Sequence, residues 1–453
     1  MNVVEYKKTL NGKKISVIGV GVSNVPLIRF LIEGGAKVTA HDKKTVEKLG
    51  DTYTELLNLG VVFVLGEDYL KNIPEDTEII FKTPGLRGDV PELIKAKEKG
   101  VEITSEMELF FKLCPCKIIA VTGSDGKTTT TTLIGEMLKK QGYTCYIGGN
   151  IGKPLIGDVE KMTAEDIAVL ELSSFQLFSM RQSADVAVIT NVTPNHLDWH
   201  KDFDEYIEAK KNIMKYQDAN GVLVTNSDNE ITKKIGKDAV GENRTFSFGG
   251  ESLVCLKDGF ICYNGENIIR TEDIKIPGNH NIENYMAAIA ATRDFVSKET
   301  VEFIAKNFGG VAHRIELVRE LNGVKYYNDS IASSPARTTA GLLSFEQKVI
   351  LIAGGYDKKI PFDEFGEVVN KKVKKLVLVG ATSDKIESAV KNASNYAGLD
   401  IIRETEFKKA IESARNCAQN GDIVLLSPAC ASFDLFDNFE VRGNTFKKIV
   451  NEF

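Results

Sequence analysis

Residues 117–130 read KIIAVTGSDGKTTT. The apolar start of this segment predicts a buried strand, and the glycine-rich loop after it leads into a stretch that predicts a helix. Glycines let main-chain N–H groups turn inward around phosphate oxygens, and the N-terminus of the helix favours negative charge. We expect Lys127 to reach the β- and γ-phosphates of a nucleotide and the Thr128 hydroxyl to ligate Mg²⁺.

The loop is a short variant of the common phosphate-binding loop, because Val121 stands where the longer loop has a glycine. Its strand–loop–helix setting favours a nucleotide site over the alternative, a glycine-rich turn without a ligand. The segment therefore predicts an enzyme that uses ATP. The loop residues expected to bind ATP are Gly123, Ser124, Asp125, Gly126, Lys127, Thr128 and Thr129.

The bulk composition is that of an ordinary globular protein. The chain has 453 residues, and this length predicts about three domains. The net charge of −6 argues against a nucleic-acid-binding protein, because phosphate backbones attract clustered Lys and Arg. No apolar run is long enough for a membrane span, and the polar N-terminus does not resemble a secretory signal. Seven scattered cysteines favour reduced thiols, so we expect a cytoplasmic protein without membrane insertion.

Apolar, β-rich runs alternate with amphipathic stretches along the whole chain. This alternation predicts βαβ units and mainly parallel sheets, and therefore an α/β fold. We expect a Rossmann-like domain at residues 1–113, a P-loop ATPase domain at 114–312 and a second Rossmann-like domain at 313–453. Locally, Lys257-Asp258-Gly259 predicts a hairpin turn, and residues 105–108 (SEME) predict a capping box at a helix start.

A second glycine motif, Gly19-Val20-Gly21, follows the first predicted strand. Asp42 ends the next strand, where a carboxylate can meet a ribose hydroxyl. Asn24 replaces the third glycine of the dinucleotide fingerprint, so the pattern indicates a nucleotide-like site that is not obviously for NAD. A purely structural turn is one alternative. A Rossmann dehydrogenase is another, although it would leave the second block unexplained.

Polar residues also follow strands in the second block. Glu171 ends a buried strand, and a carboxylate there is well placed to hold Mg²⁺ beside the phosphate loop. Residues 195–200 (NHLDWH) resemble a metal cluster. A binuclear hydrolase is one alternative for them, and another is that His200 is simply a surface residue beyond the motif. Lys210 on a predicted helix carries no functional weight alone.

Asn281 and Asn284 are three positions apart near a helix start, so both amides face one side. Paired amides either recognise an adenine edge or cap the helix. In the third block, three polar or glycine-rich segments each follow a strand and define a ligand-binding edge, most simply for a second substrate. These segments are Asn328–Ser330, Gly354–Lys358 and Ser427–Phe433.

Taken together, these segments resemble the Mur ligases of peptidoglycan synthesis over nearly the whole chain. Within that family the resemblance is strongest to members that add D-glutamate to UDP-N-acetylmuramoyl-L-alanine. The segments that carry it are 122–129, 150–152 (NIG), 171–176 (ELSSFQ), 195–198 (NHLD), 278–281 (GNHN), 313–314 (HR), 426–434 (LSPACASFD) and 438–443 (NFEVRG).

The resemblance implies five groups of site residues. The catalytic residues would be Lys127, Glu171, His196 and Lys210, and the metal ligands Thr128, Glu171, His196 and, if it is carbamylated, Lys210. Besides the loop, ATP would contact Asn281, Asn284, Arg314 and Asp329. The UDP precursor would contact Val22, Ser23, Asp42, Thr83, Gly85, Asn150 and His196. The amino acid would contact Ser333, Lys358, Ser432 and Phe439.

The resemblance further implies an acyl-phosphate mechanism that uses ATP and two Mg²⁺ sites, in a protein that we expect to be monomeric. One segment departs from the family, whose members often have DSKAT where this chain has Asp329-Ser330-Ile331-Ala332-Ser333. Ser333 keeps a hydroxyl, but Ile331 removes a lysine charge. The remaining alternatives are a sister ligase for another amino acid and a nucleotide switch that is not a ligase.

Overall fold

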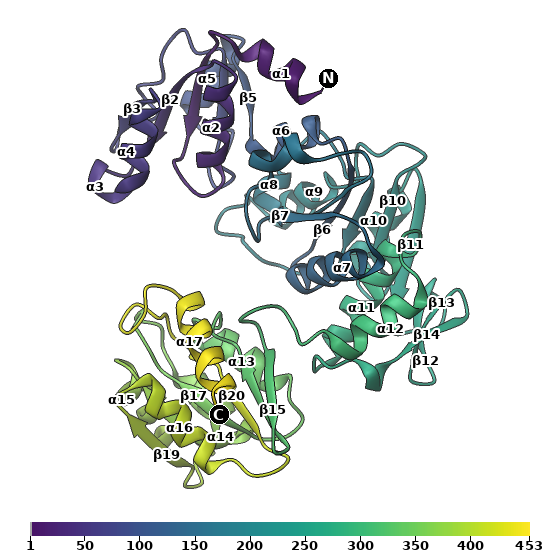
Figure 1. Ribbon diagram of the computed structural model, residues 1–453, viewed down its shortest axis with the longest axis vertical. Coiled ribbons are helices and arrows are strands. Elements are labelled where there is room, and N and C mark those ends of the chain that lie inside the picture. Colours follow the sequence, from purple (N-terminus) through teal and green to yellow (C-terminus); the bar gives the residue numbers. More distant parts are fainter. Residues whose placement is uncertain (1) are drawn as a thin grey trace. The chain divides into compact units, whose positions relative to one another are not determined.

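The computed structural model describes residues 2–453. It contains three α/β domains in chain order, each built on a mainly parallel sheet, with five, nine and six strands (Figure 1). The first two sheets belong to one compact unit, made of the residues up to Thr271 and residues 283–304. The third sheet belongs to a second unit, made of residues 272–282 and 305–453. The predicted α/β class with three mainly parallel domains is confirmed.

The first domain brings the loops after β1 and β4 together. Its sheet has the strand order β3-β2-β1-β4-β5, with parallel neighbours throughout. The strand order reverses between β1 and β4, and open α/β sheets bind ligands outside the carboxyl ends of their strands at such a point. The elements are α1 (Val3–Leu10), β1 (Lys14–Ile18), α2 (Asn24–Glu33), β2 (Lys37–Asp42), α3 (Val46–Leu49), α4 (Asp51–Asn58), β3 (Val62–Leu65), β4 (Ile79–Lys82), α5 (Pro91–Glu98), β5 (Glu102–Thr104) and α6 (Glu106–Leu113).

The second domain places β6 between β9 and β8, so the loops after these three strands meet at one sheet edge. Its sheet has the order β14-β13-β12-β11-β10-β9-β6-β8-β7. The elements are β6 (Lys117–Thr122), α7 (Lys127–Gln141), β7 (Cys145–Gly149), η1 (Leu155–Lys161), β8 (Ile167–Glu171), α8 (Ser174–Leu177), β9 (Val186–Ile189), α9 (Phe203–Lys211), β10 (Val222–Asn226), α10 (Glu230–Ile235), η2 (Gly236–Asp238), β11 (Glu242–Ser247), β12 (Val254–Lys257), β13 (Phe260–Tyr263), β14 (Glu266–Arg270), η3 (Thr271–Asp273), α11 (Asn279–Thr292) and α12 (Lys298–Asn307).

The predicted hairpin is present as β12 and β13, which pair antiparallel through Lys257 and Phe260. Asp258 and Gly259 form the two-residue turn, with φ of 49° and 77°. Positive φ at both positions is what a tight hairpin turn matched to the strand twist requires.

The third domain has the strand order β15-β16-β20-β17-β18-β19, and only β15 runs antiparallel to its neighbour. β20 lies between β16 and β17, so the loops after these three strands share one edge. The elements are β15 (Glu316–Leu321), β16 (Val324–Asn328), α13 (Pro335–Leu343), β17 (Val349–Ala353), α14 (Asp363–Lys372), β18 (Val373–Val379), α15 (Ser383–Asn392), β19 (Asp400–Glu404), α16 (Phe407–Cys417), β20 (Ile423–Leu426) and α17 (Phe439–Asn451).

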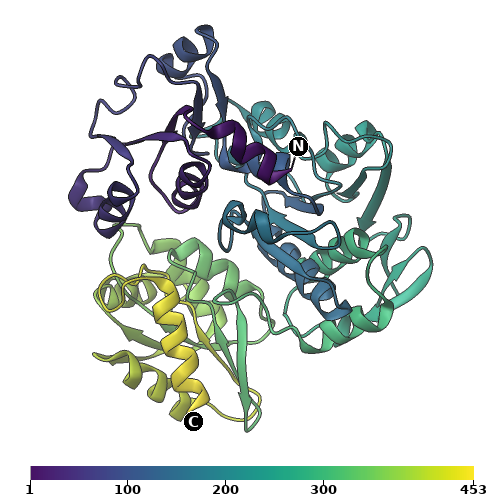
Figure 2. The same cartoon turned by 45° about the horizontal axis from the view of Figure 1, so that its top comes forward.

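Helices cover the sheets and bury their central strands. Every residue of β8, β17 and β20 is buried, as expected of parallel strands with helices on both faces. The C-terminal helix α17, yellow in Figure 2, runs along the third sheet. Its Phe446 and Val450 pack in one apolar cluster with Tyr326 of β16. Within residues 2–453, no helix combines the length and the apolar character that a membrane span would need.

Candidate active site

The phosphate loop lies between β6 and α7, as the sequence predicts. Two of its glycines have conformations that exclude other residues. Gly123 has φ of 150°, and a Cβ atom there would collide with the Thr190 side chain. Gly126, with φ of 78°, closes against Asn284 in the same way. The loop is therefore held in a fixed shape at the N-terminus of α7, where main-chain N–H groups favour an anion.

Lys127 lies over its own loop. Its Nζ donates to the main-chain carbonyls of Gly123, at 3.0 Å, and Ser124, at 2.8 Å. Ser124 is held in turn from the other side, because its Oγ lies 3.0 Å from the hydroxyl of Tyr206. A phosphate group bound in this loop would lie next to the Lys127 ammonium, as the sequence predicts.

Glu171 lies beside the phosphate loop, where the sequence predicts a carboxylate that could hold Mg²⁺. It ends β8, is 2% exposed, and accepts hydrogen bonds at both oxygens. The Thr128 hydroxyl donates to its Oε2 at 2.7 Å, and the Asn150 amide donates to its Oε1 at 2.8 Å. One carboxylate beside one hydroxyl suits Mg²⁺, which keeps most of its ligands as waters and substrate phosphates. Within residues 2–453, no three His, Cys, Asp or Glu side chains gather in a way that could hold a metal without such help.

Lys210 is buried beneath the phosphate loop. Its side chain comes from α9, is 1% exposed, and donates from Nζ to the carbonyl of Gly123 at 2.8 Å and to Thr122 Oγ1 at 3.4 Å. Neither partner is a carboxylate. Burial, reinforced by the charge of Lys127, holds the pKa of Lys210 well below its ordinary value. The structure thus joins Lys210 to the phosphate loop, which its isolated position in the sequence did not indicate.

His196 lies in the loop after β9, in a left-handed conformation with φ of 54°. The edge of its ring packs on Phe175 with 4.9 Å between ring centroids. Partial burial lowers the pKa of His196, and the charges of Lys210 and Lys127 act in the same direction, against Asp198. A neutral imidazole is the form that ligates metals.

The alternative in which His200 is a surface residue is wrong. His200 is 2% exposed, and its Nε2 lies 2.9 Å from the Ser174 hydroxyl. Phe175 stacks on the ring at 5.8 Å between centroids, and Trp199 meets it edge-on at 4.7 Å. The aromatic neighbours therefore exclude water from a histidine that ends a polar segment.

The loops after β1 and β4 adjoin each other in the first domain, as the UDP-precursor prediction needs. A Cβ atom on Gly19 would touch the Thr83 side chain at 3.0 Å, so the glycine lets the two loops approach. Asp42 accepts main-chain N–H bonds from Val20 at 2.7 Å and Lys44 at 2.9 Å, one at each carboxylate oxygen. Asp42 therefore also shapes the loop. Val22 in that loop is exposed.

Asn24 stands where the dinucleotide motif has its third glycine, and its side chain bonds to the loop. Its amide donates to the carbonyls of Ile18, at 3.1 Å, and Gly19, at 2.9 Å. These bonds brace the loop from below. Gly85, after β4, accepts a hydrogen bond of 2.9 Å from the Trp199 indole of the second domain. Ser23 stands at the start of α2 and makes no side-chain cap bond there.

In the third domain, Asp329 lies between the ends of β16 and β20. Its Oδ2 accepts from the Ser427 hydroxyl at 2.7 Å, and its Oδ1 from the Ile315 N–H at 3.3 Å. Burial raises the pKa of Asp329 to about 7. Arg314 is among the charges that act in the opposite direction.

Two of the residues predicted for the amino acid meet in the structure, because Lys358 Nζ lies 3.3 Å from Ser333 Oγ. Ser432 is buried, and so is Arg442 of the segment 438–443, to whose side chain sequence reasoning gave no role. Arg442 donates to the carbonyls of Ser330, at 2.8 Å, and Cys430, at 3.1 Å. The Ser330 hydroxyl also donates to the carbonyl of Phe439 at 2.8 Å. Arg442 thus ties the loops after β16 and β20 together.

The two helix amides predicted for adenine have different partners. The Asn281 amide donates to the Pro277 carbonyl at 2.6 Å. Asn284 accepts at Oδ1 from the Thr130 hydroxyl of α7 at 3.2 Å. The structure also places Tyr206 at the phosphate loop, a residue to which sequence reasoning gave no role. Its position four residues before Lys210 on one helix face is the signal that would have found it.

Comparisons with known proteins agree with this geometry. Sequence models of the Mur ligase MurD-like N-terminal domain, the Mur ligase middle domain and the Mur ligase glutamate ligase domain match residues 13–105, 121–292 and 313–430. A protein of Clostridium kluyveri named UDP-N-acetylmuramoylalanine–D-glutamate ligase is 54% identical over 100% of this chain and 99% of its own. A protein of the same name from Clostridium botulinum is 52% identical over 99% of both chains.

Solved structures agree at the level of the fold. UDP-N-acetylmuramate-alanine ligase of Thermotoga maritima matches with a TM-score of 0.59 and 19% identity, over 97% of this chain and 99% of that one. A UDP-N-acetylmuramoyl-L-alanyl-D-glutamate–2,6-diaminopimelate ligase also has a TM-score of 0.59, at 17% identity over 98% and 94% of the two chains. Because full-length relatives share more than half of its residues and the phosphate-loop site is in place, the chain belongs to the Mur ligase family.

Proposed function

We propose that this chain joins D-glutamate to the L-alanine carboxyl group of UDP-N-acetylmuramoyl-L-alanine, with ATP converted to ADP and phosphate. The full-length relatives carry the name of that activity. The observation that carries the proposal is Glu171, whose two oxygens are held by Thr128 and Asn150 directly beside the phosphate loop. This arrangement suits an enzyme that presents the γ-phosphate of ATP to an anionic acceptor.

The work divides among three segments of the chain. We assign the UDP part of the precursor to residues 1–113, where Asp42 and Thr83 line the strand-order reversal. We assign ATP to residues 114–312 and D-glutamate to residues 313–453. Asn281, Arg314 and Asp329 would frame the adenosine and its ribose. Each assignment follows the rule that ligands bind at the carboxyl ends of parallel strands.

The chemistry is two nucleophilic substitutions. The L-alanine carboxylate attacks the γ-phosphorus of ATP, which forms an acyl phosphate and releases ADP. The D-glutamate amine then attacks the acyl carbon, and phosphate leaves with the carboxylate oxygen. The carboxylate and the γ-phosphate are both anions, so Lys127 must offset their repulsion while the loop keeps them in line. Mg²⁺ would supply further charge neutralisation at Glu171, and a second site is proposed at His196 and Lys210.

Lys210 suits carbamylation. A buried amine with a lowered pKa has its neutral, nucleophilic form available at neutral pH. Addition to CO₂ forms an N–C bond and releases one proton, so that a cation becomes a carboxylate. His196 lies in the adjacent loop, and its lowered pKa keeps a metal-binding imidazole available. These two side chains are the proposed second metal site.

For D-glutamate, the pairing of Lys358 with Ser333 offers a cation and a hydroxyl to a carboxylate. Ser432 and Phe439 complete the proposed site. Ile331 contributes no charge there, unlike the lysine that many family members have. We further propose that the enzyme acts as a monomer in the cytoplasm, where ATP and nucleotide sugars are available.

An amino-acid panel tests the assignment. Phosphate release is measured with ATP, Mg²⁺ and UDP-N-acetylmuramoyl-L-alanine, with D-glutamate, L-alanine or diaminopimelate as the amine. Phosphate release with D-glutamate, matched by formation of the dipeptide product, is expected. Activity with only the other two amino acids would assign the chain to a sister ligase. ATP hydrolysis that needs no amine would favour a nucleotide switch.

A further inference from the structure

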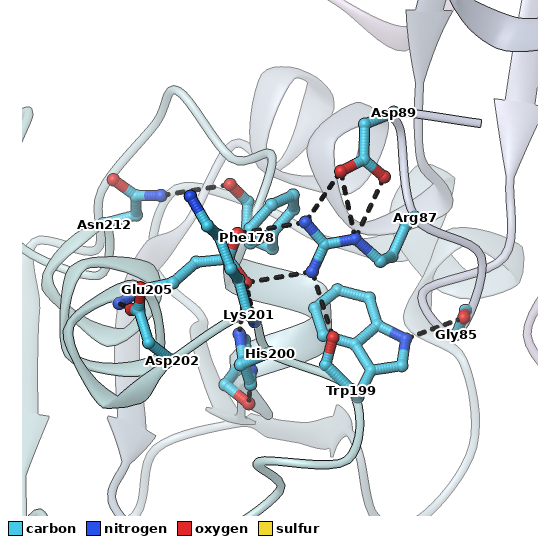
Figure 3. Close-up of polar contacts among 11 residues, drawn as sticks. Gly85, Arg87, Asp89, Phe178, Trp199, His200, Lys201, Asp202, Glu205 and Asn212 are labelled. Atoms are coloured by element: carbon cyan, nitrogen blue, oxygen red, sulfur yellow. Dashed lines mark hydrogen bonds and ion pairs between the residues drawn. The ribbon is translucent and has the colours of Figure 1, made fainter. Parts of the chain in front are cut away.

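Arg87 connects the first and second domains of one compact unit through an extensive set of contacts (Figure 3). Its guanidinium has five N–H donors, and all of them are used. Nε donates to Asp89 at 2.9 Å, and Nη2 donates to Asp89 at 2.8 Å and to Glu205 at 3.0 Å. Nη1 donates to Glu205 at 2.9 Å and to the Trp199 carbonyl at 3.0 Å. Asp89 belongs to the first domain, whereas Glu205 and Trp199 belong to the second.

Aromatic rings enclose the same group. The guanidinium carbon lies 5.1 Å from the ring centroids of both Phe178 and Trp199. The side chains of Arg87 and Glu205 are only 24% and 21% exposed. Arg87 is the main cause that lowers the pKa of Glu205 to about 2. A planar, bidentate and partly desolvated ion pair of this kind fixes the relative position of its two side chains, which an exposed ion pair does not.

On the first-domain side, Arg87 follows the loop proposed to hold the UDP precursor. Gly85, two residues earlier, accepts the Trp199 indole bond of 2.9 Å. Arg87 and Trp199 therefore join the precursor loop to the segment that carries His196. The main-chain N–H of Trp199 also donates to the His196 carbonyl at 3.1 Å, which links the two residues within one turn of the chain.

On the second-domain side, Glu205 stands in the first turn of α9. Its own N–H is capped by Asp202 at 2.8 Å, which fixes where the helix begins. The next residue, Tyr206, contacts Ser124 of the phosphate loop at 3.0 Å, and Lys210 donates to Gly123 at 2.8 Å. One short helix thus connects Arg87 at its start with the phosphate loop along its length.

We propose that Arg87 is a positioning residue for ligation, which fixes Trp199 and Glu205 so that His196 and Lys210 stay in register with the phosphate loop. The inference rests on the proposed function of these two residues. Asp89 already neutralises the charge of Arg87 within the first domain. The bonds to Glu205 and Trp199 are therefore not needed to balance that charge, and their effect is to fix the positions of these two residues. Lysine cannot replace Arg87, because an ammonium group has only three donors and lacks the planar geometry that a bidentate pair requires.

The test compares Arg87→Met and Arg87→Lys with the control Arg29→Met, which removes the exposed Arg29–Glu55 pair of the same domain. Steady-state kinetics yield kcat, the KM for ATP and the Mg²⁺ concentration for half-maximal rate, at a temperature where calorimetry shows each variant folded. In both Arg87 variants kcat should fall on the order of 10- to 100-fold, as catalytic groups misplaced by about 1 Å do. The Mg²⁺ requirement should rise, and the KM for ATP should stay within about twofold of the wild type, as should every parameter of the control.

A double variant sharpens the result. Arg87→Met combined with Glu205→Gln should be no slower than Arg87→Met alone, because both substitutions break the same contact, the one between Arg87 and Glu205. The inference is overturned if Arg87→Met keeps its kcat and Mg²⁺ dependence, whatever its melting temperature, or if Arg87→Lys is fully active. The comparison uses whichever amino acid the wild type accepts. A wild type inactive with D-glutamate would therefore contradict the proposed substrate and leave the role of Arg87 still measurable.

Discussion

Lys210 donates a hydrogen bond of 2.8 Å from Nζ to the main-chain carbonyl of Gly123, so a buried amine lies directly against the phosphate loop. Burial, with the charge of Lys127 added, lowers the pKa of this amine well below its ordinary value. A lysine in such a position costs stability, because its ammonium form has left water without gaining a carboxylate partner.

Lys210→Met should therefore separate activity from stability. We expect kcat to fall by about 100-fold or more, because the proposed second metal site loses one of its two protein side chains. The folded pKa lies below the unfolded value of about 10.4, so the folded state binds fewer protons and the unmodified lysine destabilises it at lower pH. The variant should melt no lower than the wild type in CO₂-depleted buffer at pH 7. Lys211→Met, which alters a neighbour paired with Glu208 and Asp238 on the surface, is the control. A Lys210→Met enzyme within threefold of wild-type kcat would contradict the assignment.

Glu171→Gln should raise the Mg²⁺ requirement. The amide keeps the shape of the side chain but removes the charge, and it cannot accept from both Thr128 and Asn150. We expect kcat to fall about 10²- to 10³-fold at fixed Mg²⁺, with partial recovery as Mg²⁺ is increased. The matched control is Glu136→Gln on the exposed face of α7, where Glu136 pairs with Lys139. A Mg²⁺ titration that superimposes on that of the wild type would place the metal elsewhere.

Asp42→Asn should weaken binding of the UDP precursor and leave binding of ATP unaffected. The two oxygens of Asp42 each accept a main-chain N–H, and an amide would set its NH₂ group against one of these donors. Loss of one such bond costs about 1–3 kcal/mol, which corresponds to a rise of roughly 10- to 100-fold in the KM for UDP-N-acetylmuramoyl-L-alanine. Asp68→Asn, which breaks an exposed pair with Lys71, is the control. An equal rise in the KM for ATP would argue against a local effect.

Asp329 should make the third domain less stable as pH rises. Its folded pKa of about 7 lies above the unfolded value of about 3.9. The stabilising contribution is therefore complete below about pH 4 and is lost as pH rises through about 7, by at most about 1.4 kcal/mol per pH unit. Calorimetry of Asp329→Asn between pH 5 and 8 should show a flatter melting profile than the wild type. The exposed Asp400→Asn should keep the wild-type profile, and parallel profiles for all three proteins would refute the shift.

Much of the fold of this chain could be predicted from local sequence patterns. The phosphate loop and the Asp258-Gly259 hairpin depend on residues that are adjacent in sequence, and both have the expected geometry. The capping box at Ser105 is only half formed. The Ser105 hydroxyl accepts the Glu108 N–H at 3.2 Å, but the Glu108 carboxylate accepts from the Ser105 hydroxyl at 3.1 Å instead of from its main chain.

Contacts between distant residues were beyond sequence reasoning. The sequence left open a surface position for His200, but Phe175 and Trp199 bury its side chain. Arg87 carried no signal either, because its partners Trp199 and Glu205 lie 112 and 118 residues away. Periodicity and motif spacing describe one segment at a time. The contacts of His200 arise when separate segments of the second domain pack together, and those of Arg87 arise when the first and second domains pack together.

In the proposed reaction, the L-alanine carboxylate of the precursor takes the γ-phosphate of ATP before D-glutamate attacks. Precursor labelled with ¹⁸O in both oxygens of that carboxylate reveals whether it does. With ATP, Mg²⁺ and D-glutamate, mass spectrometry of the released phosphate should find one ¹⁸O atom per molecule, together with dipeptide product that retains the other. Unlabelled phosphate accompanying product formation would contradict the acyl-phosphate route, and phosphate release without product would contradict the ligase assignment itself.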